Sequence, residues 1–142
     1  MEENLITKIA QYALVIKEKK MLILWPSEKT PLWVLPGGRI NSLDKNSISA
    51  LNREVKEEIN NEVSIIEPFY VEMYEVPEKG KRYVVFFLCK LVGKEKDIKL
   101  SKEHSKYEWL SYEELLKNLM TSPERGKPGI NLINKLRERD IL

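Results

Sequence analysis

The segment 47–60 constrains the fold of this chain more than any other part of it. Its apolar residues recur at intervals of three and four, at Ile48, Leu51, Val55 and Ile59. This spacing gives the apolar stripe of an amphipathic α-helix that packs one face on a core. Asn46 or Ser47 can cap the start of the helix, and Asn60 can end it because asparagine tolerates the left-handed conformation. We therefore expect a helix in the middle of the chain.

Most other segments are predicted as β-strands, because they combine β-branched and aromatic residues in short apolar runs. The predicted strands are residues 7–17, 21–25, 32–35, 62–74, 84–92 and 107–110. The first two form a hairpin, and Gly37-Gly38 turns the chain after the third. Two late helices are predicted at 111–119, which begins with a capping box of Ser111 and Glu114, and at 130–139. This order predicts a mixed β-sheet packed between α-helices.

The size and charge of the chain exclude several classes of protein. Its 142 residues suit one domain, which we expect to comprise residues 1–142. A net charge of +2, from 24 basic and 22 acidic side chains, gives no electrostatic footprint for duplex nucleic acid or an anionic membrane. No apolar run approaches the roughly 18 residues of a membrane helix, and residues 1–4 lack the charge pattern of a signal peptide. The expected location is cytoplasmic.

The chain has one cysteine and one histidine, and neither is placed for nucleophilic catalysis. Cys89 ends the apolar run 83–89, so we expect it to be a small buried hydrophobe, and one cysteine forms no internal disulfide. His104 lies in the polar segment 101–105, so we expect a surface or loop residue, and a position lining a pocket is the alternative.

Three glutamates gather on the predicted central helix. At about 100° per residue, Glu54, Glu57 and Glu58 span roughly 100° of one helix face. Like charges at this spacing destabilise a helix by about 0.2–0.5 kcal/mol per pair, which Arg53 offsets in part by reaching Glu57. Hard carboxylate oxygens gathered in one place suit Mg²⁺ or Mn²⁺ rather than Zn²⁺. A solvated helix face is the alternative that three glutamates alone leave open.

The order of these features resembles the Nudix box, Gly-x5-Glu-x7-Arg-Glu-U-x-Glu-Glu-x-Gly-U, in which U is aliphatic. Gly38, which follows Pro36-Gly37, matches the first glycine, and residues 53–58 match the second half. The flanking segments 32–36 and 108–115 are also similar, so the resemblance extends over nearly the whole chain.

The chain departs from this pattern between the glycine and the arginine. Asp44 falls where the first glutamate is expected when counted from Gly38, but Arg53 then follows one residue late, and counting back from Arg53 gives Lys45. Asn60 replaces the second glycine, and Asn61 replaces an aliphatic residue. The role of Asp44 is therefore open, while the three glutamates are intact.

The resemblance implies an α/β (α+β) Nudix fold and a Mg²⁺-dependent pyrophosphohydrolase, with Mn²⁺ able to substitute. Its substrate would be a nucleoside diphosphate linked to another group X, cleaved by metal-activated water. The implied metal ligands are the Gly37 carbonyl and the carboxylates of Glu54, Glu57, Glu58 and Glu103.

The resemblance also implies roles for other residues. Arg53 would orient the glutamates, and Arg39 would neutralise a substrate phosphate. Either Glu54 or Glu103 would activate the water, and Glu108 is the second candidate for the position given to Glu103.

Two other functions and several substrates stay open. The chain could be a non-catalytic Nudix-fold module that binds a nucleotide or a protein, or an unrelated α/β protein; degenerate family members usually lose the helix glutamates, which this chain keeps. Pro77 lies near a proline position of some ADP-ribose pyrophosphatases, whereas Pro36-Gly37-Gly38 differs from the Pro-Lys-Gly common in dinucleoside polyphosphate hydrolases. A (d)NTP is a third substrate class. Candidate residues for base stacking are Trp25, Trp33, Tyr74 and Tyr83. A homodimer is compatible with the sequence.

Overall fold

The computed structural model describes residues 2–28, 32–118 and 129–142. Its strands are β1 (Lys8–Lys17), β2 (Lys20–Pro26), β3 (Gly37–Arg39), β4 (Val63–Val76), β5 (Gly80–Leu91) and β6 (His104–Leu110). Its helices are α1 (Ser47–Ile59), α2 (Tyr112–Lys117) and α3 (Ile130–Glu138), with a 3₁₀ turn at Glu95–Asp97. Within these residues no helix has the length and apolar character needed to span a bilayer.

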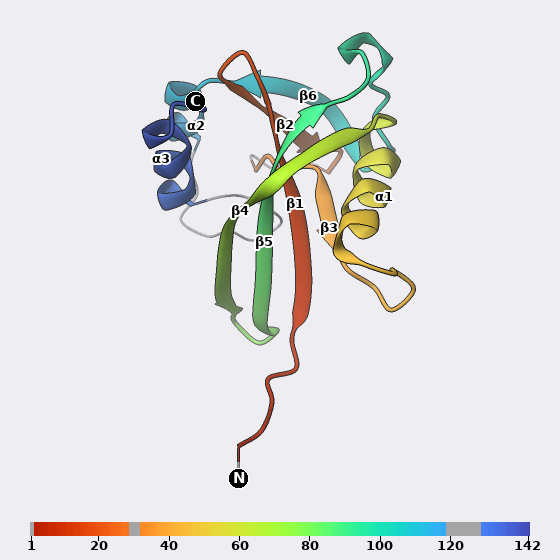
Figure 1. Cartoon of the computed structure of the whole chain (residues 1–142), viewed down its shortest axis with the longest axis vertical. Helices are drawn as coiled ribbons and strands as arrows, with labels where there is room; N and C mark the ends of the chain where they lie inside the picture. The colour runs from red at the N-terminus through yellow and green to blue at the C-terminus, as the bar shows by residue number, and fades with distance from the viewer. Residues whose placement is uncertain (1, 29–31, 119–128) are drawn as a thin grey trace.

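The strands form a mixed sheet in the order β4-β5-β1-β2-β6, with β3 attached to β1 (Figure 1). Strands β1 and β5 run parallel, and the other pairs are antiparallel. β2 pairs with β1 only at the hairpin end, where Ile16 faces Met21. Further along β1, β3 takes the place of β2 and sets Gly37 beside Tyr12. This fork brings the glycine segment into the middle of the sheet.

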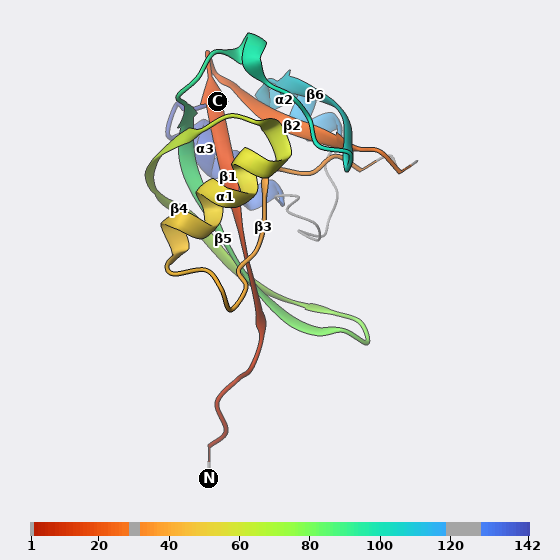
Figure 2. The same ribbon diagram turned by 90° about the vertical axis from the view of Figure 1, so that its right-hand side faces the viewer.

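Helices cover both faces of the sheet, as the sequence predicts (Figure 2). On one face α1 packs Leu51, Val55 and Ile59 against strand residues such as Ala13 and Val15. On the other face α2 and α3 pack against a second cluster, which includes Leu14. Successive β1 side chains therefore enter opposite cores, as the period of a strand requires. Both faces of β1 are buried, which explains why residues 13–15 are apolar throughout.

Helix α1 begins and ends where the sequence predicts. The Asn46 side chain accepts a hydrogen bond from the Ser49 N–H at 2.9 Å, and Asn60 adopts the left-handed conformation with φ of 52°. Three of the four stripe residues are buried, but Ile48 in the first turn is 45% exposed. At α2, Ser111 and Glu114 form the expected capping box; residue 119, included in that predicted helix, lies outside the described residues.

The prediction around the glycine pair is wrong by a few residues. Residues 32–35 do not form a strand: Val34 makes an isolated bridge to Leu24, and Pro36 has no N–H to continue the pairing. Gly37-Gly38, predicted as a turn, is instead strand β3 against β1. A Cβ on Gly37 would overlap the Gln11 carbonyl oxygen. The absence of side chains therefore permits a close strand pairing here.

Candidate active site

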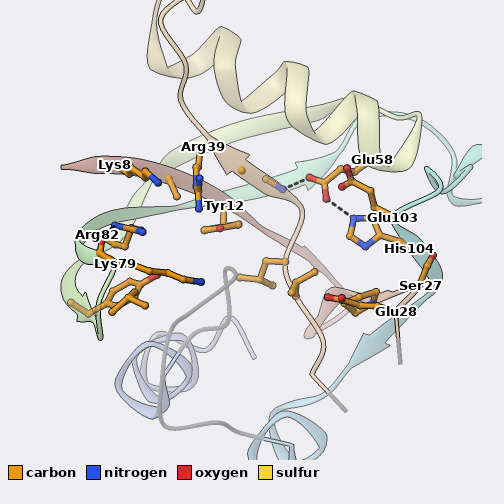
Figure 3. A pocket seen from close by; sticks show the side chains of 18 residues that line it. Lys8, Tyr12, Ser27, Glu28, Arg39, Glu58, Lys79, Arg82, Glu103 and His104 are labelled. Carbon is orange, nitrogen blue, oxygen red and sulfur yellow. Dashed lines mark hydrogen bonds and ion pairs between the residues drawn. The ribbon is translucent and has the colours of Figure 1, made fainter. Parts of the chain in front are cut away.

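A cavity of about 690 Å³ opens beside the junction of β1 and β3. One end is acidic, with Glu58 from the last turn of α1 and Glu103 just before β6. The other end is basic and is lined by Lys8, Arg39, Lys79 and Arg82 (Figure 3). These ends are called the acidic end and the basic end below. The cavity therefore separates opposite charges along its length.

Glu58 is the most enclosed carboxylate of the acidic end. Its side chain is 9% exposed, and His104 Nε2 lies 2.7 Å from its Oε2. The Gly37 N–H donates to its Oε1 at 2.7 Å. Burial raises the pKa of Glu58, while the hydrogen bonds from His104 and Gly37 lower it. The two donors fix the carboxylate at the cavity wall (Figure 3).

Glu54 lies one turn earlier on α1 and rests against β3. A Cβ added to Gly38 would stand 2.8 Å from the Glu54 carboxyl carbon. Arg53 contacts the same carboxylate at 3.2 Å. Burial raises the pKa of Glu54, the Arg53 charge lowers it, and Glu58 and Glu57 raise it further. Gly38 therefore makes the space that this carboxylate fills.

Asp44 has a definite contact despite the longer loop. Arg53 Nε and Nη2 donate to its two carboxylate oxygens, each at 3.0 Å. This hydrogen bond from Arg53 is the main reason why the pKa of Asp44 is lowered. The loop also closes locally, because the Asn41 N–H donates to Asp44 Oδ2 at 2.9 Å. Asp44, rather than Lys45, is thus the acidic residue opposite Arg53.

The remaining predicted site residues are only partly brought together. Glu57 is 60% exposed and contacts Arg53 at 3.4 Å, away from the described residues that line the cavity. Glu103 lies with Glu58 and His104 in one group whose ligand atoms are all within 4.8 Å of one another. Arg39 lines the basic end. Glu108, the second candidate for the Glu103 position, pairs with Lys106 at 3.0 Å and does not line the cavity.

The main expectation for His104 is wrong, and the alternative is right, since His104 lines the cavity. It is the first residue of β6 rather than a loop residue, and its side chain is 6% exposed rather than on the surface. The signal that could have found it is its place next to Glu103. Cys89, by contrast, is buried as predicted, and burial raises the pKa of its thiol to about 12.

Of the four residues at the basic end, the sequence predicts Arg39 alone. Arg82 is buried and donates to the Lys79 and Lys81 carbonyl oxygens at 3.0 Å. Lys8, Arg39 and Lys79 have no acidic partner in the part of the chain that the structure describes. Alternation along β1 places Lys8 on the same face as Ala10 and Tyr12, and that periodicity was readable in the sequence.

Two tyrosines line the cavity together with the charged residues. Tyr74 is one of the four aromatic candidates for stacking, whereas Trp33 is fully buried in the core. Tyr12 was not a candidate, and burial raises the pKa of its hydroxyl well above the usual range. Two aromatic side chains therefore lie in the same cavity as the charged residues.

The donor set of the acidic end fits a divalent cation. Among the described residues, Glu58, Glu103 and His104 form a group with the spacing of metal ligands. The carboxylates are hard oxygen donors of the kind that Mg²⁺ and Mn²⁺ prefer. Glu54 stands nearby over Gly38, where a side chain would fill the space.

Comparison with known proteins gives the family. The NUDIX domain model matches residues 7–129. The chain belongs to the Nudix family. This agrees with the fold, since a NUDIX hydrolase from Nitrosomonas europaea superposes with a TM-score of 0.76 and 17% identity, over 96% of this chain and 95% of that one. A C. elegans Ap4A hydrolase solved as a binary complex superposes with a TM-score of 0.73 and is 24% identical in sequence, over 94% of this chain and 97% of that one.

A curated relative is similar over a shorter segment. The asymmetrical bis(5'-nucleosyl)-tetraphosphatase of Mus musculus is 32% identical over 98 residues. The match covers 67% of this chain and 66% of the mouse enzyme, just under two thirds of that relative's length.

Proposed function

We propose that this protein is a Mg²⁺-dependent hydrolase of pyrophosphate bonds in a nucleoside diphosphate linked to another group. The observation that carries the proposal is the cavity itself, with carboxylates at one end and, at the other, basic side chains that have no acidic partner among the described residues. Phosphates need cationic partners, and Mg²⁺ shares its ligands between protein carboxylates and substrate phosphates. One cavity supplies both requirements.

The residues at and beside the acidic end would have two functions, metal binding and activation of water. Glu58 and Glu103 would hold the cation, with Glu54 and the Gly37 carbonyl beside them. Glu57, which is 60% exposed and does not line the cavity, stays a ligand implied by the family pattern alone. When bound, Mg²⁺ neutralises phosphate charge and lowers the pKa of a coordinated water. Glu54, which stands over Gly38, is one candidate for the base that removes the water proton. Glu103 is the other candidate.

The residues around them orient the site and bind the substrate. Arg53 holds Glu54 in place through its own anchor on Asp44. At the basic end, Arg39 and Lys79 would bind substrate phosphates, and Tyr74 offers a face for a base.

Dinucleoside polyphosphates are the first substrates to test. The curated relative is a bis(5'-nucleosyl)-tetraphosphatase, and this similarity weighs against the argument drawn from Pro36-Gly37-Gly38. A basic end with several cations also suits a chain of several phosphates. ADP-ribose and (d)NTPs complete the panel, and the expected cytoplasmic location stays a prediction.

The test is turnover of that panel with Mg²⁺ or Mn²⁺, followed by chromatography of the nucleotide products. Hydrolysis at one pyrophosphate bond, abolished by EDTA and restored by the metal, is the expected result. Binding without turnover across the panel would replace the enzyme by the non-catalytic module.

A further inference from the structure

The His104 ring has a single polar contact within the described residues. Its Nε2 lies 2.7 Å from Glu58 Oε2, and its Nδ1 is buried with no hydrogen-bond partner in residues 2–28, 32–118 and 129–142. A carboxylate accepts hydrogen bonds and does not donate them, so Nε2 carries the proton in this contact. Among the described residues, the polar contact of the ring is therefore directed at the Glu58 carboxylate alone.

The contact completes a grip on Glu58 from two sides. The Gly37 N–H holds Oε1 at 2.7 Å, and His104 holds Oε2 at the same distance. Each carboxylate oxygen keeps a second lone pair, which stays available for another partner. The donors thus set the direction of the carboxylate without using up its capacity to bind.

The same short segment also carries Glu103. The Ser101 N–H donates to the Glu58 carbonyl oxygen at 2.9 Å, and the Ser27 N–H donates to the Glu103 carbonyl oxygen at 2.7 Å. His104 and Glu58 are separated by 46 residues in sequence. The ring therefore ties the last turn of α1 to the segment that brings Glu103 into the cavity.

We propose that His104 is a positioning residue, which orients the Glu58 carboxylate so that it binds a divalent cation together with Glu103. The proposal rests on the metal-dependent function proposed above and adds a role that the Nudix pattern does not contain. Hydrogen-bond partners of metal ligands contribute about 10–100-fold to metal affinity. His104 acts on the cation through Glu58 and makes no bond to it.

The test compares replacements that keep or remove the donor. In His104→Gln the side-chain amide can place an N–H near the position of Nε2, whereas His104→Leu fills similar space without a donor. Ser105→Ala is the matched control, because that exposed neighbour makes only long contacts, at 3.4 Å and 3.5 Å, to main-chain oxygens. Mn²⁺ binding to each protein without substrate is measured by isothermal titration calorimetry, and thermal melts without metal report the fold.

The expected result is a Mn²⁺ dissociation constant raised about tenfold or more in His104→Leu, and kept within about threefold of wild type in His104→Gln and Ser105→Ala. Unchanged binding by His104→Leu would overturn the proposal. Equal loss in the Gln and Leu variants would also overturn it, because it would mean that the ring itself binds the metal or shapes the fold.

Two further outcomes are separated by the design. If His104→Leu does not fold, the comparison uses His104→Asn, whose shorter amide does not reach Glu58, and the same difference from His104→Gln is required. If the wild-type protein binds no Mn²⁺, the proposed function fails and the role of His104 falls with it. Wild-type binding that all variants retain overturns the role of His104 alone.

Discussion

At the acidic end of the cavity both oxygens of Glu58 have a donor, whereas at the basic end Lys8, Arg39 and Lys79 are exposed and have no acidic partner in the described residues. Glu58 stands on α1 and Glu103 just before β6, while Lys8 and Arg39 stand on β1 and β3. Lys79 stands on the turn between β4 and β5. Two hydrogen bonds thus hold Glu58 in one orientation, whereas no hydrogen bond among the described residues orients the side chains of Lys8, Arg39 and Lys79. A fixed carboxylate suits catalysis, and cations without fixed partners suit ligand binding.

The largest effect should come from Glu58→Gln, which keeps the shape and removes the charge. We expect kcat to fall by about 10²–10³-fold, because the acidic end supplies the charge that holds the metal and the water. Steady-state assays at saturating Mg²⁺ measure it. Glu57→Gln is the comparison: at 60% exposure it should lose no more than about tenfold. Equal losses would mean that the exposed carboxylate of Glu57 matters as much for turnover as the enclosed one of Glu58.

Gly38→Ala should come next, since its Cβ would stand 2.8 Å from the Glu54 carboxyl carbon and displace that group. A displacement of about 1 Å can cost 10²-fold in rate, and we expect kcat/KM to fall by about that factor. Gly129→Ala is the control, because a Cβ there meets none of the described residues within 4 Å. Wild-type activity in Gly38→Ala would show that Glu54 does not need its place against β3.

The basic end should respond in KM. We expect Lys79→Ala to raise KM about five- to tenfold with kcat nearly unchanged, because one exposed charge–phosphate contact is worth about 1 kcal/mol. Lys81→Ala, two residues further along the same hairpin but outside the cavity lining, should change neither constant. A fall in kcat instead would mean that the two ends are not separate in function.

The smallest effect concerns the metal-free protein. Burial raises the pKa of Glu54, so the folded protein holds this proton more tightly than the unfolded chain does. The resulting stability is present at low pH and is lost as the pH rises through the raised pKa. Glu54→Gln should therefore melt a few degrees above wild type at pH 7 in EDTA, and the difference should shrink towards pH 4. If the difference in melting temperature between Glu54→Gln and wild type stayed constant from pH 7 to pH 4, the raised pKa of Glu54 would not be its cause.

The sequence predicted those elements whose signals lie within one short segment. Helix α1 could be predicted with both ends because its stripe and its caps lie within one segment. The burial of His104 could not be predicted, since its partner Glu58 lies 46 residues away and its neighbour Glu103 was the one local signal. Strand β3 was missed because the decision between turn and strand at Gly37-Gly38 is made by β1, which offers the pairing. The residues 37–38 by themselves do not show which strand they will pair with.

The contact between Asp44 and Arg53 has a consequence for how relatives of this chain should vary. Aspartate is one methylene shorter than the glutamate of the family pattern, and the loop before Arg53 is one residue longer. In the structure the longer loop lets the shorter side chain make both hydrogen bonds at 3.0 Å. The two departures offset each other, so loop length and acid length should covary: relatives with the extra residue should carry aspartate, and those without it glutamate.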